Sequence, residues 1–99
     1  MNDKVTEVIF RKEHFNDGTQ DIIACFPYEC EKFPNIQAFV CNTLFDGEKW
    51  IIISYDYFLK CKLATFIEYK KAEQELKNMG LNIKVIQRIN YNRYAQSHY

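Results

Sequence analysis

The chain has 99 residues, 47% of them hydrophobic and 26% charged, which is the size and composition of one small globular domain. Its 13 basic and 13 acidic residues cancel, so no net charge attracts it to nucleic acid or anionic lipid. No aliphatic run is longer than Ile51–Ile53, beside Trp50, and this is far shorter than the roughly 20 residues of a membrane helix. The first residues contain no apolar targeting core, so we expect a cytoplasmic protein without membrane contact.

The first part of the sequence predicts three strands. Residues 4–12 carry the β-branched and aromatic side chains that suit a pleated surface, and the turn signal Asn16–Gly18 follows. Residues 21–26 form an apolar run typical of a strand buried on both faces, and Pro27 ends it because proline cannot donate to a ladder. Residues 36–45 are the third predicted strand.

Asp46 and Gly47 predict a hairpin turn that leads into a fourth strand over residues 49–57. Alternation places Trp50, Ile52 and Ser54 on one face of this strand. The other face would carry Ile51, Ile53, Tyr55 and Tyr57. Because both faces are apolar, we expect this strand to lie in the centre of the sheet.

The firmest local signal is a helix. Thr65–Glu68 has the pattern of a capping box, and an apolar stripe follows from Phe66 to Met79. Gly80 stands where a left-handed C-terminal cap belongs. Residues 81–90 then alternate as a strand, whereas residues 91–99 show no regular pattern.

The predicted order β-β-β-β-α-β corresponds to an α+β fold. We expect a mainly antiparallel sheet of about five strands with one helix packed on one face. Residues 1–90 would form a single domain, and residues 91–99 a C-terminal tail, whose order the sequence leaves open. Because one helix covers only one face, the other face must meet solvent, a loop, a second copy or a partner.

Little in the sequence indicates catalysis. Each of the three glycines has a structural position, at two turns and a helix cap, so none remains for a phosphate-binding loop. His14 lies beside a turn and His98 in the tail, and neither has a companion for acid–base chemistry. We therefore expect no catalytic residues and no cofactor.

The four cysteines are Cys25, Cys30, Cys41 and Cys61, and in the cytoplasm they would be reduced thiols. Their spacing lacks the two close pairs of a typical zinc site, so we expect core packing and no metal. Cys30 and Cys61 are the more exposed candidates for a reactive thiol. A small hydrolase or thiol enzyme is accordingly a third, weaker functional class.

Aromatic residues make up 16% of the chain, and one helix cannot cover all of them. Tyrosine-rich surfaces are favoured protein contacts, so the predicted strand face that carries Tyr55 and Tyr57 is a candidate partner-binding site. A homodimer or a different protein would both satisfy this surface.

Beyond Gly80 the chain has no acidic residue. Cations interleaved with aromatic rings suit the binding of unpaired bases and phosphates. The candidate residues for single-stranded RNA or DNA are Lys84, Arg88, Tyr91, Arg93 and Tyr94.

Four short blocks carry a family resemblance: Val8–Lys12, Asp21–Pro27, Ala64–Tyr69 with the following Glu75-Leu76, and Lys84–Arg88. They resemble small uncharacterised proteins of Bacteroidetes phages and mobile elements. Residues 28–62 depart from that family's pattern, which often has histidines there. The resemblance implies an accessory protein of a phage or integrated element, and it implies no active site.

Together these features favour a non-enzymatic binding protein. Its expected partner is a host protein or ribonucleoprotein complex. By analogy with other phage proteins, it would inhibit a bacterial defence nuclease through protein contact, as anti-CRISPR proteins do. The alternative is a single-stranded RNA- or DNA-binding module that uses the basic, tyrosine-rich C-terminal region.

Overall fold

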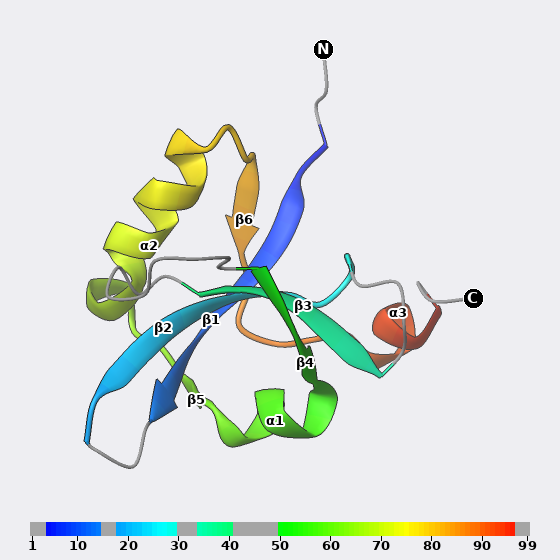
Figure 1. Cartoon of the computed structure of the whole chain (residues 1–99). Helices are drawn as coiled ribbons and strands as arrows, with labels where there is room; N and C mark the ends of the chain where they lie inside the picture. Colours follow the sequence, from blue (N-terminus) through cyan, green and yellow to red (C-terminus); the bar gives the residue numbers. More distant parts are fainter. Residues whose placement is uncertain (1–3, 15–17, 30–33, 41–49, 97–99) are drawn as a thin grey trace.

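A computed structural model describes residues 4–14, 18–29, 34–40 and 50–96. It confirms the α+β fold: a six-stranded sheet carries one main helix and two short ones (Figure 1). Within these ranges, no helix combines the length and the apolarity needed to cross a membrane. The elements are β1 (Thr6–His14), β2 (Gln20–Phe26), β3 (Asn35–Val40), β4 (Trp50–Ser54), α1 (Tyr55–Lys60), β5 (Lys62–Leu63), α2 (Phe66–Asn78), β6 (Ile83–Val85) and α3 (Tyr91–Gln96).

The sheet has the order β4-β3-β2-β1-β5, and all of these neighbours are antiparallel. The outer edge of β1 is shared by two short strands. β6 runs parallel to its first part, where Thr6 lies opposite Ile83. β5 pairs antiparallel with its later part, where Arg11 lies opposite Leu63. β1 and β2 are therefore the central strands.

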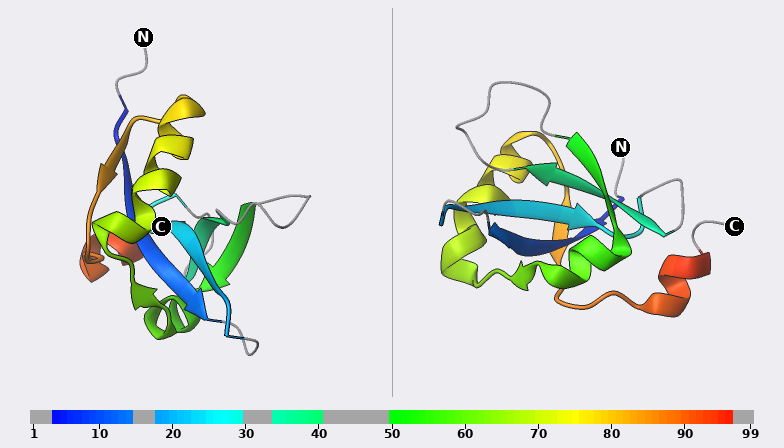
Figure 2. Two further views of the ribbon diagram at one scale, coloured as in Figure 1. Left: turned by 90° about the vertical axis from the view of Figure 1, so that its left-hand side faces the viewer. Right: turned by 60° about the horizontal axis from the view of Figure 1, so that its bottom comes forward.

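Helix α2 covers one face of the sheet, as Figure 2 shows from the side. The predicted capping box is confirmed: the Glu68 backbone N–H donates to the Thr65 hydroxyl, and the Thr65 N–H donates to the Glu68 carboxylate. Gly80, at φ 91°, has the left-handed conformation that the sequence predicts after the helix. The first core lies beneath this helix and consists of Val8, Phe10, Ala24, Phe26, Phe39, Ala64, Ala72 and Leu76.

The opposite face is also covered, by α1 and α3. The sequence pattern indicates no regular element after residue 90, but residues 91–96 form α3. Tyr94 of this helix is completely buried, and its hydroxyl donates to the Asn35 carbonyl at 3.0 Å. The second core on this face consists of Ile9, Ile23, Cys25, Ile36, Ala38, Ile53, Phe58, Cys61 and Tyr94. The strand face left uncovered by the main helix is thus closed by the chain itself.

The predicted fourth strand, 49–57, ends early. Its residues from Tyr55 onward form α1, because Ser54 acts as the N-cap and accepts a hydrogen bond from the Tyr57 N–H at 3.1 Å. Asp56 in the first turn and Lys60 in the last turn complement the helix dipole. Local capping therefore overrides the alternating pattern.

The predicted strand 81–90 is also shorter, spanning only Ile83–Val85. The last hydrogen bond between this segment and β1 runs from the Ile86 N–H to the Val8 carbonyl. The next carbonyl on the same edge of β1, that of Phe10, already accepts from the Ala64 N–H, so the pairing ends there. The third predicted strand, 36–45, is described from Asn35 to Val40. The predicted turn at residues 46–47 lies outside the described residues.

We predict that Thr65→Ala lowers the free energy of unfolding by about 1 kcal/mol, because the Glu68 amide loses its acceptor. Gly80→Ala should cost a similar ~1 kcal/mol through backbone strain alone, since a Cβ there meets open space. Urea denaturation measures both changes. Thr65→Ser keeps the hydroxyl and should behave like the wild type. A neutral Thr65→Ala variant would contradict the role of the cap.

Candidate protein-binding surface

The α2 face of the sheet extends beyond the helix. On this face Phe26 of β2 lies opposite Gln37 of β3, and Gln37 lies opposite Ile52 of β4. Because cross-strand partners share a face, these three side chains form a row that ends at the open side of β4. Ile52 is 67% exposed, so the outer end of this row is uncovered.

Trp50 stands beside this row and is 36% exposed. Its ring lies edge-on to Phe39, with centroids 4.9 Å apart, and tilted against Phe26 at 5.6 Å. The two phenylalanines belong to the first core, so they hold the indole in place while one side of it remains accessible. A fixed, partly exposed tryptophan is a common anchor of protein interfaces.

A groove of about 310 Å³ opens between this tryptophan and the start of β1. Its apolar walls come from Phe26, Trp50 and Leu81, and a rim ion pair joins the Lys4 ammonium to the Glu29 carboxylate at 2.9 Å. The full lining consists of Lys4, Thr6, Phe26, Glu29, Gln37, Trp50 and Leu81, which we call the aromatic groove. An apolar floor with a polar rim is the composition expected of a binding site.

The position of β4 differs from the sequence-based prediction. We expected a central strand because both of its faces are apolar, but β4 forms the edge of the sheet beyond β3. Only one face of β4 packs into a core: Ile53 is buried in the second core, whereas Trp50 and Ile52 lie on the uncovered face. The apolar pattern therefore marks an exposed surface.

Tyr55 and Tyr57, the predicted partner-binding residues, lie on α1 and do not share a strand face. Tyr55 is half-buried and stacks on Tyr94, with ring centroids 5.5 Å apart, so it belongs to the packing of the second core. Tyr57 is 39% exposed, and its hydroxyl donates to the Glu13 carboxylate. The two tyrosines therefore form no continuous apolar strip with Ile51 and Ile53.

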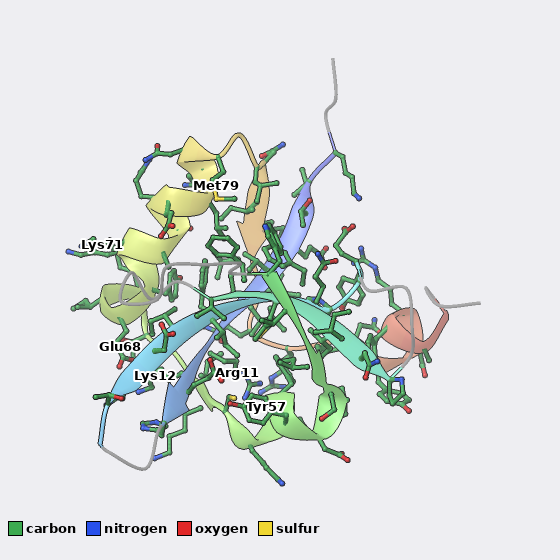
Figure 3. The ribbon with its side chains drawn as sticks, viewed as in Figure 1. Arg11, Lys12, Tyr57, Glu68, Lys71 and Met79 are labelled. Carbon is green, nitrogen blue, oxygen red and sulfur yellow. The ribbon has the colours of Figure 1, made fainter. Side chains whose placement is uncertain are left out.

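A polar cluster lies between β1, which carries Arg11 and Glu13, and α1, which carries Tyr57. Figure 3 labels Arg11 and Tyr57 on these two elements. The Arg11 guanidinium lies 4.2 Å from the centroid of the Phe58 ring and donates to the Cys61 carbonyl at 2.8 Å. Glu13 is buried and accepts from Tyr57. These contacts connect the sheet to α1 through cation–π and hydrogen-bond interactions.

The chemistry of this cluster favours the neutral form of Cys61. Burial, followed by the nearby negative charge of Glu13, raises the pKa of the Cys61 thiol. The hydrogen bond to Glu13 raises the pKa of Tyr57 strongly, and burial adds to that shift. Cys61 is buried, so its predicted exposure was wrong, and a protonated buried thiol is a poor nucleophile.

The predicted packing of Cys25 is confirmed, since this residue is completely buried in the second core. Cys30 and Cys41 lie outside the described residues. In the described part of the chain, no three His, Cys, Asp or Glu side chains gather in a way that could hold a metal ion.

The residues predicted to bind single-stranded nucleic acid do not form one stacking platform. Tyr94 is buried, so its ring is inaccessible to a base. Arg93 lies 4.0 Å from the centroid of the Tyr28 ring and donates from one nitrogen to both Glu7 carboxylate oxygens at 2.9 Å. This bond to Glu7 raises the pKa of Arg93. Lys84, Arg88, Tyr91 and Arg93 are exposed, but the Tyr91 ring packs edge-on against Tyr55, with centroids 5.9 Å apart.

The sequence pattern does not indicate a function for Phe26, Gln37 or Leu81, and it places Trp50 only on one face of a strand. They come from different segments and meet only through strand register. The one local signal is the alternation that places Trp50 and Ile52 on the same face.

Searches of family models, curated proteins and solved structures found no match to this chain.

We predict that the polar cluster makes the fold sensitive to alkali. Folding raises the pKa values of Cys61 and Tyr57, so the stability they add is complete below their unfolded values of about 8.5 and 10. It is lost as the pH rises above those values. Tyr57→Phe should lower the free energy of unfolding at neutral pH by about 1 kcal/mol and weaken the alkaline loss.

Urea denaturation between about pH 7 and pH 11, with reductant, measures both effects. Tyr69→Phe is the matched control, because it removes a hydroxyl from the opposite face of the sheet and keeps the ring that stacks on Phe10. It should retain the wild-type pH dependence. An identical alkaline slope in the wild type and Tyr57→Phe would show that the Tyr57–Glu13 contact does not act in this way.

Proposed function

We propose that this is a non-enzymatic binding protein that contacts a protein partner through the aromatic groove. The observation that carries the proposal is the fixed, partly exposed Trp50 beside an apolar groove on the part of the sheet that α2 leaves uncovered. Tryptophan held in this way contributes strongly to protein interfaces, because it buries a large rigid surface at little cost in conformational entropy.

The dimensions of the groove favour a side chain of another protein as its occupant. A volume of about 310 Å³ is at the low end of the range for ligand sites, which extends to roughly 1,000 Å³. Phe26, Trp50 and Leu81 would surround an apolar or aromatic group, and the Gln37 amide offers a neutral hydrogen-bonding partner. The Lys4–Glu29 pair at the rim adds polar contacts without a net charge.

We extend the proposal to the partner's class. The resemblance to proteins of Bacteroidetes phages and mobile elements favours a host protein or ribonucleoprotein complex. By analogy, the complex would belong to a bacterial defence system, which the protein would inhibit by occupying a contact surface. Inhibition by contact requires a binding surface and no catalytic group.

We predict that Trp50→Ala weakens partner binding about thirty-fold or more, which corresponds to a loss of 2 kcal/mol at a central anchor. Tagged wild-type protein would be used to capture partners from a Bacteroidetes lysate. Affinities would then be measured with the purified partner. Phe66→Ala is the control, because Phe66 is exposed on α2 and does not line the groove. It should bind like the wild type.

Gln37→Lys provides a second variant, which places a long charged side chain in the groove and leaves the packing of Trp50 intact. Thermal unfolding would establish that both variants fold. Wild-type affinity in both folded variants would overturn the groove as the contact site. Affinity that falls steeply with salt and depends on Lys84 and Arg88 would instead support nucleic-acid binding.

A further inference from the structure

The outer edge of β4 presents backbone groups that β3 does not use. The Tyr55 N–H donates to the Pro34 carbonyl at 2.9 Å, which identifies Tyr55–Pro34 as a hydrogen-bonded pair of the antiparallel ladder. Such pairs alternate with non-bonded pairs, so Ile53 and Ile51 also face β3. The N–H and C=O groups of Ile52 and Trp50 therefore point away from the sheet.

This edge lacks the features that normally protect an edge strand. Natural edges carry charged side chains, proline or bulges that prevent pairing with another chain. β4 reads Trp-Ile-Ile-Ile-Ser, with no charge and no proline, and its ladder with β3 is regular from Trp50 to Ser54. Among the described residues, no strand pairs with its outer side (Figure 2).

We propose that β4 pairs antiparallel with β4 of a second copy, about a twofold axis at Ile52. The register is self-complementary: Ile52 would form a hydrogen-bonded pair with its own equivalent. Trp50 would lie opposite Ser54 of the second copy, and Ile51 opposite Ile53. Near the axis, each outward-facing N–H would meet a C=O of the second copy, and apolar side chains of the two copies would meet on both faces of the sheet.

A second copy fits this edge better than an arbitrary foreign strand. It supplies a strand of equal length whose alternation matches by symmetry, and the zero net charge of the chain creates no long-range repulsion between copies. The 67% exposed Ile52 side chain would be covered by its equivalent across the axis. The exposed end of the cross-strand row of Phe26, Gln37 and Ile52 would then become the centre of a continuous sheet.

This inference goes beyond the proposed function, which needs only one groove. In the dimer, both aromatic grooves would lie on the same side of the extended sheet, because Trp50 and Ile52 share a face. A partner with two equivalent sites would bind with increased avidity.

Sedimentation equilibrium of the full chain tests the dimer, and we expect a dimer whose population rises with concentration. Ile52→Lys should give a monomer, because it places a charge on the axis. Ile52→Pro should do the same, since it removes an N–H that points outward and keeps the bonds to β3. Ile67→Lys is the control, because this residue is 77% exposed on α2 and far from β4 in sequence, and it should remain dimeric.

Hydrogen exchange distinguishes strand pairing from other contacts. The Trp50 and Ile52 amides should be protected from exchange in the dimeric wild type. In the control Ile67→Lys they should be protected in the dimer as well, and they should exchange rapidly only after dilution to the monomer. In monomeric Ile52→Lys, the Trp50 amide should exchange rapidly, whereas the Ile51 and Ile53 amides stay protected by their bonds to β3.

A wild-type chain that remains monomeric up to about 1 mM would overturn the proposal. A dimer that persists in the folded Ile52 variants would also overturn it. Partner binding by monomeric Ile52→Lys tests the groove separately.

Discussion

The structure depends on one constraint: the central strands β1 and β2 are apolar on both faces. Val8 and Phe10 face α2, whereas Ile9 between them faces the opposite side, and all three are buried. A sheet of this kind is stable only when both faces are covered, because each uncovered face would leave a continuous apolar surface in water. The positions of all three helices follow from this requirement. α2 covers one face, and α1 with α3 covers the other.

The two covers are built differently. α2 has a capping box and 13 residues, so local interactions contribute to its stability. α1 and α3 have six residues each, which is too short for a helix to persist in water by itself. Their structure depends on contacts with the sheet and with each other: Phe58 of α1 and Tyr94 of α3 are buried in the second core, and Tyr55 of α1 stacks on Tyr94. The sheet and its second cover therefore form as one unit.

This difference explains what could be predicted from the sequence. The capping box at Thr65 and the left-handed Gly80 are local features, so the helix bounds and the α+β class could be predicted. α3 could not, because its stability comes from the contact between Tyr94 and residues distant in sequence. The edge position of β4 was also missed, since strand order depends on long-range pairing and apolar alternation is the same in a central strand and an uncovered edge. The aromatic groove could not be predicted for the same reason, because strand register brings its lining residues together from distant segments of the chain.

The groove and the open edge of β4 have a common origin in the width of the sheet. α2 packs over β1 and β2, and the sheet continues past it through β3 to β4. A single exposed isoleucine on such an extension would need no explanation. Here Ile52 continues a row through Gln37 to the groove, beside a tryptophan fixed by two core phenylalanines. An exposed surface of this kind adds nothing to the core of one molecule, and the two proposed contacts between molecules both depend on it.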